Sequence, residues 1–251
     1  MFFFYSSSIL LRFFFDSSLV FWFDPWWCAS PLARLELSSL EKDLNESLAR
    51  LCTSYLDVYL LHRDDPVRFP NVSTIVENMH GLVLSGKIKA WGTSNFTVAR
   101  LVEIHACAVQ HNWTPPSHCS PQCSLAVPTR AVWEGTTHWS EEHRSLGHRN
   151  TKVCAWATLG EGTLCGTVPD RRGGAACWSS ALNQQRRARL QAMAQRKGVS
   201  AAVVAIAYVL NHVPGCSAIV GCRNGRHFQD AARASTMVLR EEEMKWLRCE
   251  D

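Results

Sequence analysis

The sequence predicts an α/β protein with a parallel sheet, and two observations carry that prediction. Short apolar segments that suit buried strands alternate with longer segments of helical spacing, which is the pattern of βαβ units covered on both faces. Polar residues follow several strand segments, where a (β/α)8 barrel keeps its chemistry. The Gly-rich fingerprint of a doubly wound nucleotide-binding sheet is absent from the sequence, so a barrel is favoured over that fold.

The first helix is expected to begin at Ser38, because Ser38 and Glu41 have the spacing of a capping box. Four leucines follow on one face of this helix: Leu40, Leu44, Leu48 and Leu51. The next helix is expected to end at Gly86, and a later basic helix at Gly198. Helical spacing places these two helices at residues 72–83 and 183–197. It places the others at residues 97–109, 200–210, 226–234 and 240–248.

Strands are expected where short apolar segments lie between these helices. They cover residues 56–61, 88–91, 119–123, 153–157 and 218–221. Outside the expected strands, residues 112–150 are rich in Pro, His and Trp and are predicted to be irregular. Residues 166–180 hold Gly, Pro and Arg and are predicted to form a surface loop.

Composition limits the class of protein. An apolar fraction of 47% with 19% charged residues is typical of a globular chain with a sizeable core, which excludes general disorder. The net charge of +4 is small and scattered, so it gives no reason to expect a nucleic-acid partner. The 11 Cys are odd in number and lack paired spacing, which favours a reducing compartment and predicts a cytoplasmic protein.

Residues 1–27 differ from the rest of the chain because Phe and Trp crowd them. No Lys or Arg precedes the apolar run, and Arg12 and Asp16 interrupt it, so neither a secretory signal nor a membrane span fits well. Three alternatives stay open: a segment without an evolved role, a membrane anchor through residues 2–23 or an uncleaved signal, and two strands packed on the body. We therefore divide the chain into an atypical segment, 1–27, and one domain, 28–251.

A metal site is not expected. The spacing of His138, His143 and His148 does not place them on one helix face, and no Cys or carboxylate completes a set. Cys119 and Cys123 lack a second pair of the kind that zinc sites use.

Six segments, taken together, resemble the aldo-keto reductases, which are NADP-dependent barrel enzymes that reduce aldehydes and ketones. The segments occur in the family's order and span about residues 36–248. They are DVYLLHRDDP (57–66), GLVLSGKIKAWGTSNFT (81–97), SPQCSLA (120–126), VCAWATLGEG (153–162), KGVSAAVVAIAYVL (197–210) and AIVGCRNGRHFQDA (218–231). The resemblance implies a (β/α)8 barrel, NADP(H) as cofactor and a small carbonyl compound as substrate.

The resemblance also implies site residues. His62 matches the active-site His, which orients the substrate carbonyl. Ser94, Asn95 and Gln122 match the groups that bond the nicotinamide carboxamide, and Trp156 matches the ring stacked on the nicotinamide. The groups expected along the rest of the cofactor are Leu159 and Gly160 over the pyrophosphate, Arg223 at the 2′-phosphate and Asp230 at the adenosine.

The family's general acid is a Tyr tuned by a Lys and an Asp, and these residues precede the His. In this sequence Trp26 and Trp27 stand where the Lys is expected, and no Lys precedes Lys42. We therefore expect a barrel that is incomplete at its N-terminal end, with its first two or three β/α units missing or replaced.

Activity is then expected to be weak or absent. The alternative is a non-catalytic protein that binds a nucleotide or a protein partner. The carbonyl substrate, the direction of the reaction and the oligomeric state stay open.

Overall fold

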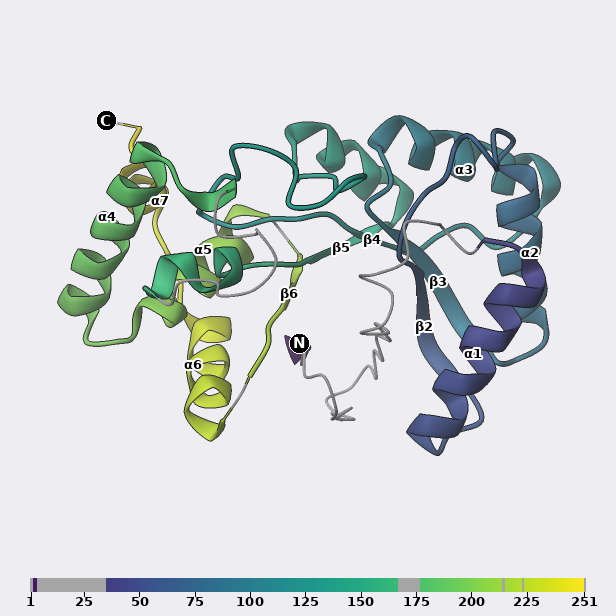
Figure 1. Cartoon of the computed structure of the whole chain (residues 1–251), viewed down its shortest axis with the longest axis horizontal. Coiled ribbons are helices and arrows are strands. Elements are labelled where there is room, and N and C mark those ends of the chain that lie inside the picture. The colour runs from purple at the N-terminus through teal and green to yellow at the C-terminus, as the bar shows by residue number, and fades with distance from the viewer. Residues whose placement is uncertain (1, 4–34, 167–176, 214, 223, 251) are drawn as a thin grey trace. The chain divides into compact units, whose positions relative to one another are not determined.

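The computed structural model describes residues 2–3, 35–166, 177–213, 215–222 and 224–250 (Figure 1). These residues form two compact units. The N-terminal unit contains residues 35–120 and 140–152, and the C-terminal unit contains residues 2–3, 121–139 and 153–250. Apart from residues 2–3, the expectations for residues 1–27 lie outside the described residues, as does Arg223.

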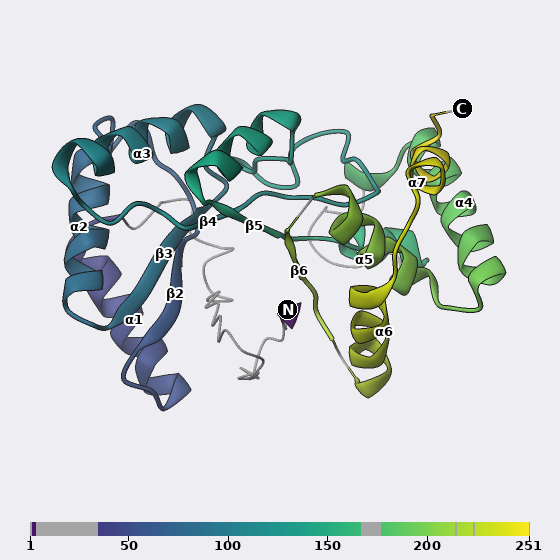
Figure 2. The same cartoon turned by 180° about the vertical axis from the view of Figure 1, so that it is seen from behind.

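The N-terminal unit is a parallel sheet in the order β2-β3-β4 with helices between the strands. Its strands are β2 (Leu56–Leu61), β3 (Ile88–Ser94) and β4 (His118–Ser120). Its helices are α1 (Leu37–Leu51), α2 (Ser73–Leu84), α3 (Val98–His111) and the 3-10 helix η2 (Glu141–Arg149). Figures 1 and 2 both show α2 and α3 along the same side of β2 and β3.

The sequence explains why β3 lies at the centre of this sheet. Ile88, Trp91 and the residues from Gly92 to Ser94 are buried, which suits a strand with neighbours on both sides. A Cβ atom at Gly92 would lie 2.3 Å from the carbonyl oxygen of His118 on β4. The close approach of β3 and β4 therefore requires glycine at this position.

The C-terminal unit contains the parallel pairs β5–β6 and β6–β1. These strands are β5 (Lys152–Ala155), β6 (Ser217–Ile219) and β1 (Phe2–Phe3). The helices are η3 (Gly160–Cys165), α4 (Ala181–Lys197), α5 (Ala201–His212), α6 (Gly225–Thr236) and α7 (Glu241–Arg248). Every residue from Val203 to Val209 in α5 is buried, so this helix forms the core of the unit.

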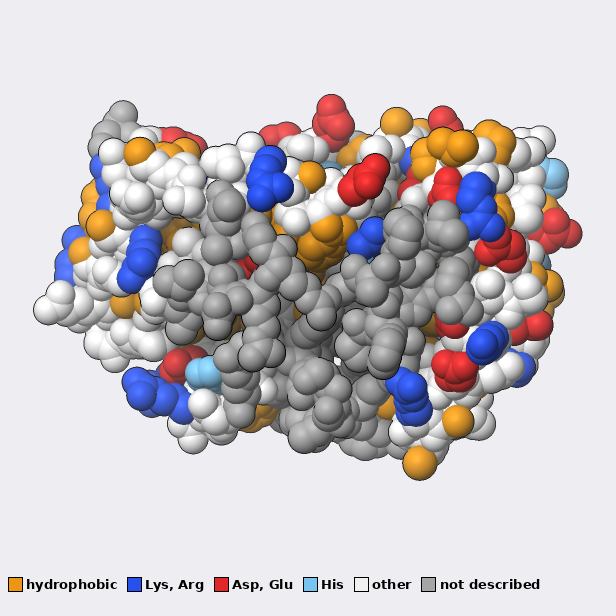
Figure 3. Space-filling model, in the orientation of Figure 1, with side chains coloured by type: hydrophobic (Ala, Val, Ile, Leu, Met, Phe, Trp, Pro, Cys, Tyr) orange, Lys and Arg blue, Asp and Glu red, His pale blue; other side chains and the backbone are white. Residues whose placement is uncertain are grey.

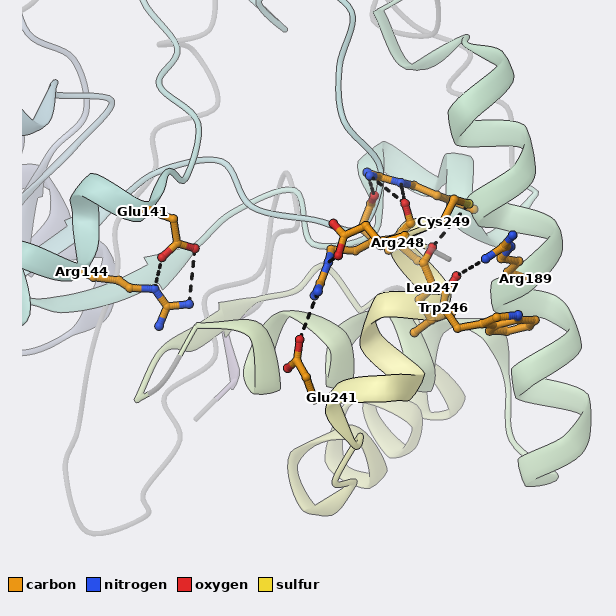
Figure 4. A network of polar contacts seen from close by, with 11 residues as sticks. Glu141, Arg144, Arg189, Glu241, Trp246, Leu247, Arg248 and Cys249 are labelled. Atoms are coloured by element: carbon orange, nitrogen blue, oxygen red, sulfur yellow. Dashed lines mark hydrogen bonds and ion pairs between the residues drawn. The ribbon is translucent and has the colours of Figure 1, made fainter.

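Arginine side chains join α4 to α7 (Figure 4). Arg189 donates a hydrogen bond of 2.8 Å to the carbonyl oxygen of Trp246, and Arg186 donates to the carbonyl oxygen of Arg248. Arg248 in turn forms ion pairs with Glu241 and Glu250. These contacts add hydrogen bonds to carbonyl groups of the last turn of α7, where a helix leaves carbonyl groups short of backbone partners.

The expected alternation of strands and helices is confirmed, with shifts at the ends. The structure matches the predicted strand 56–61 residue for residue, and it extends the predicted strand 88–91 to Ser94. The predicted strand 119–123 ends at Ser120 and continues only as isolated bridges at Gln122. Gly198 ends α4 in the left-handed conformation, as expected.

Three local predictions are wrong. Helix α1 begins at Leu37, so Ser38 lies inside its first turn and caps nothing, and Leu51 is only half-buried. Residues 141–149, predicted to be irregular, form η2, because Ser140 and His143 make a capping box. Trp178, predicted to lie in a surface loop, is buried and donates to Glu161.

Basic and acidic side chains are interspersed on the face of each unit drawn in Figure 3. Among the described residues, no single helix has the length and apolar content needed to cross a membrane. By length and composition alone, only a pair of helices bent by 104°, Ala181–Lys197 with Ala201–His212, passes that test.

Candidate active site

In the N-terminal unit, the polar residues expected at the site lie where neighbouring strands end. His62 follows β2, and Ser94 ends β3 opposite Ser120 of β4. The strands are parallel, so these positions share the carboxyl edge of the sheet. The Ser94 hydroxyl donates a hydrogen bond of 3.0 Å to the carbonyl oxygen of Ser120, which joins β3 to β4 at this edge.

Asn95 ties this edge together. It has a φ of +60°, a left-handed conformation that Asn tolerates better than most residues. Its Nδ2 donates to the carbonyl oxygen of His62 at 3.2 Å and to the Ser94 hydroxyl at 3.1 Å. Both amide hydrogens therefore bond groups of the protein.

His62 is neutral at pH 7. Burial, and after it the charge of Arg63, lowers the pKa of His62 to about 4. A neutral imidazole donates a hydrogen bond from one ring nitrogen, but it gives up that proton far less readily than an imidazolium. His62 is thus suited to orienting and polarising a carbonyl group rather than to protonating it.

A buried arginine fixes the segment that follows His62. Arg100 on α3 donates to the Asp64 carboxylate at 3.1 Å, to the carbonyl oxygen of Pro70 at 3.0 Å and to that of Phe69. Burial raises the pKa of Asp64, and the adjacent Arg100 charge opposes that rise. The ion pair therefore anchors residues 64–70 to α3.

In the C-terminal unit, Gln122 is buried and its side chain bonds the protein. Its Oε1 lies 2.9 Å from Nδ1 of His138, and its Nε2 donates to the Ser124 hydroxyl at 3.2 Å. A parallel bridge pairs its backbone with Trp156, which directly follows β5. Gln122 and Trp156 are thus brought together at the carboxyl end of β5.

Trp156 has a partner that the sequence did not indicate. The rings of Trp133 and Trp156 stack with their centroids 4.5 Å apart and their planes at 23°. Both indole nitrogens are buried, and neither has an acceptor within the part of the chain that the structure describes. A buried donor without an acceptor costs about 1–3 kcal/mol.

Leu159 and Gly160 begin a tight loop. The carbonyl oxygen of Leu159 accepts a hydrogen bond from the backbone of Gly162 at 3.1 Å, and Gly160 donates to the carbonyl oxygen of Ala157 at 2.8 Å. Four residues of the loop have positive φ, namely Gly160, Glu161, Gly162 and Gly166, and Ala157 just before it does too. Such conformations expose backbone groups to a nearby ligand.

Asp230 contacts the start of α5. Its carboxylate accepts a hydrogen bond of 2.8 Å from the Ser200 hydroxyl, and that hydroxyl also accepts from the backbone of Val203 as the cap of α5. Asp230 therefore has a structural contact in addition to its expected role at adenosine. Of the histidines considered above, His138 bonds Gln122 and His143 caps η2.

The structure thus groups the expected residues within each unit: His62 with Ser94 and Asn95, and Gln122 with Trp156. Sequence reasoning missed Trp133, because it lies in a stretch without periodicity.

Known proteins resemble this chain over most of its length. The sequence profile of the Aldo/keto reductase family matches residues 27–248. Norsolorinic acid reductase A of Aspergillus parasiticus is 26% identical over 216 residues, which cover 82% of this chain and 51% of that protein. The 6-dehydroglucose reductase of Novosphingobium aromaticivorans is 27% identical over 196 residues, with coverage of 78% and 56%. The chain spans about half the length of these relatives.

Solved structures show the same likeness. An aldo/keto reductase from Klebsiella pneumoniae in complex with NADP and acetate aligns with a TM-score of 0.63 and 25% identity, covering 84% of this chain and 64% of that chain. A thermostable aldo-keto reductase in complex with the inhibitor epalrestat aligns with the same TM-score of 0.63 at 20% identity, with coverage of 86% and 68%, a likeness of fold.

Proposed function

Because this chain belongs to the aldo/keto reductase family, we propose that it binds NADP(H) and reduces small aldehydes or ketones, or oxidises the matching alcohols, at a low rate. The parallel strands belong, in this proposal, to a (β/α)8 barrel of the family's type. The observation that carries the proposal is made within each unit: Asn95 lies at the carboxyl end of a strand in the N-terminal unit, and Gln122 and Trp156 lie together at the end of β5 in the C-terminal unit. Such ends hold the chemistry of barrel enzymes.

The residues suit a nicotinamide dinucleotide. Amide side chains can bond the carboxamide of the nicotinamide, and the flat indole of Trp156 suits its ring. The loop from Leu159 contains glycines with positive φ, which let backbone groups approach phosphates. Arg223 supplies the cation for a 2′-phosphate and Asp230 the contact with adenosine. When bound, NADPH supplies a hydride to the carbonyl carbon of the substrate.

His62 has the role of holding the substrate carbonyl. Its low pKa keeps the imidazole neutral, so one ring nitrogen donates a hydrogen bond to the carbonyl oxygen. Proton delivery to the developing alkoxide then needs another group. The 251-residue sequence has only Tyr5 ahead of Tyr55 and no Lys ahead of Lys42. Because general acid catalysis contributes about 10²–10⁴-fold, turnover is expected to be lower by that factor.

A second function, nucleotide binding without catalysis, is favoured by the neutral state of His62. A neutral His62 that has no Tyr–Lys pair ahead of it in this sequence can bind a carbonyl without reducing it. The two functions agree on the cofactor and differ only in turnover. Quenching or enhancement of nicotinamide fluorescence measures nucleotide binding, and NADPH consumption with an aromatic aldehyde measures turnover.

The experiment uses the parent chain, His62→Ala and the control His111→Ala, which removes an exposed histidine from the end of α3. Slow NADPH consumption that His62→Ala abolishes and His111→Ala preserves is expected of a reductase. Saturable NADPH binding without consumption would indicate the non-catalytic function. A parent chain that neither binds nor consumes NADPH would refute both.

A further inference from the structure

Arg187 on α4 lies over the loop that begins at Leu159. A Cβ atom added at Gly166 would lie 2.5 Å from Nη2 of Arg187 and 3.3 Å from its Cζ. Gly166 also has a φ of +82°, a conformation that favours glycine. The guanidinium therefore packs directly against the backbone at the end of η3, and a side chain at position 166 would displace it.

Arg187 differs from the other arginines of its helix. Arg186 and Arg189 donate to carbonyl oxygens, and Arg196 stacks on the ring of Trp246 at 4.7 Å. Arg187 is half-buried, yet it forms no hydrogen bond or ion pair with another residue of the described part of the chain. A partly desolvated cation without a counter-charge indicates a place for an anion.

The charges around Arg187 agree with this interpretation. Burial raises the pKa of the Cys165 thiol, the charge of Asp230 raises it too, and the charge of Arg187 lowers it. Arg187 and Asp230 therefore both lie near Cys165. Asp230 accepts a hydrogen bond of 2.8 Å from the Ser200 hydroxyl and forms no ion pair with Arg187 in the described part of the chain. The nearby carboxylate thus does not serve as the counter-ion of Arg187.

We propose that Arg187 binds the pyrophosphate of the dinucleotide, an inference that rests on the proposed function. The planar guanidinium donates two parallel hydrogen bonds to phosphate oxygens, and it lies against the loop assigned to the pyrophosphate. The pyrophosphate is common to NADPH and NADH, whereas the 2′-phosphate assigned to Arg223 is present only in NADPH. The two arginines therefore contribute to different parts of the same cofactor.

The test measures dissociation constants for NADPH and NADH by nicotinamide fluorescence with the parent chain, Arg187→Met, Arg196→Met and Arg223→Ala. Arg187→Met is expected to weaken both nucleotides by the same factor, about tenfold or more, as for loss of a charge-assisted hydrogen bond. Arg223→Ala is expected to weaken NADPH alone. Arg196→Met removes the same charge from the same helix and is expected to change neither constant.

Each other outcome overturns the inference. A loss confined to NADPH in Arg187→Met would assign Arg187 to the 2′-phosphate, and an unchanged affinity for both nucleotides would remove it from the site. An equal loss in Arg196→Met would indicate a general effect of helix charge. Failure of the parent chain to bind either nucleotide would refute the proposed function itself. Equal thermal unfolding midpoints for the parent and Arg187→Met establish that the variant is folded.

Discussion

The two units differ in what their polar side chains bond. In the N-terminal unit, Asn95 and Arg100 donate to the protein's own carbonyl and carboxylate groups. In the C-terminal unit, the indole nitrogens of Trp133 and Trp156 lack an acceptor and Arg187 lacks an ion-pair partner, as far as the structure describes the chain. The contrast has exceptions in both units. Among the described residues of the N-terminal unit, Arg63 Nε and Thr93 Oγ1 lack partners, and in the C-terminal unit Arg186 and Gln122 bond the protein.

On the proposed function, the bonded groups stabilise the fold, whereas Arg187 binds a ligand. A buried donor with a protein acceptor adds to the stability of the folded chain, whereas one without an acceptor costs about 1–3 kcal/mol until a ligand supplies it. Removing the donors of the N-terminal unit should therefore change unfolding, and removing Arg187 should change nucleotide affinity instead.

The largest expected effect on stability follows from Arg100→Met. The side chains of Arg100 and Asp64 are only 8% and 12% exposed, so the variant leaves a buried carboxylate without its cation. Breaking such a pair by removing one partner costs about 3–5 kcal/mol. Urea unfolding of the parent and the variant measures the loss. Arg196→Met, which removes an exposed arginine from the C-terminal unit, is the control. An equal loss of stability in both variants would show that the buried ion pair of Arg100 contributes nothing beyond an exposed arginine.

The next effect concerns the contact between β3 and β4. In Gly92→Ala the new methyl group would lie 2.3 Å from a backbone oxygen, so the strands must separate. Forcing extra atoms into a packed core costs about 1–3 kcal/mol. Gly81→Ala in α2 is the matched control, because nothing lies within 4 Å of its Cβ position and alanine favours a helix. Thermal unfolding should show a lower midpoint for Gly92→Ala than for the parent, and no lowering for Gly81→Ala.

The smallest effect of a single side chain is its contribution to the loss of stability in acid. Burial lowers the pKa of His105 and of His118 to about 4, with smaller contributions from the charges of Arg149 and Lys152. An unfolded His has a pKa of about 6.5. Below that value the unfolded chain takes up protons that the folded chain does not, so stability is full above pH 6.5 and falls as the pH approaches 4.

Each of these histidines should contribute about 1–2 kcal/mol to the loss. The measurement is the free energy of unfolding between pH 7 and pH 4.5, monitored by near-ultraviolet circular dichroism. In His105→Gln, which keeps an amide near the Thr151 hydroxyl that His105 contacts at 2.9 Å, the loss should be smaller. A pH dependence equal to that of the parent would show that His105 does not titrate in this way.

Local signals in the sequence were sufficient for most of the fold. The strand 56–61 was predictable because it is a continuous apolar segment bounded by polar residues. The start of α5 was predictable because Ser is a preferred N-cap residue, and the Ser200 hydroxyl does accept a hydrogen bond from the backbone N–H of Val203. The start of α1 was not, because its cap position, Glu36, makes no side-chain bond that a motif would reveal.

Residues of the candidate site that belong to sequence motifs could be named from the sequence. Contacts that depend on how distant segments pack could not. His62, Asn95 and Trp156 come from motifs whose order along the chain is informative. Trp133 reaches Trp156 from a stretch without periodicity, and only the three-dimensional structure brings their rings to 4.5 Å. Arg187 has the sequence context of a surface residue, and its position over Gly166 depends on how η3 turns.

The three bonds of Arg100 have a consequence for how the protein opens. Asp64, Phe69 and Pro70 are all held by one guanidinium on α3, so their segment cannot detach one residue at a time. A connecting segment ordinarily frays independently of the helices beside it. Here we expect the segment after His62 to open together with α3, because one guanidinium holds both ends of residues 64–70.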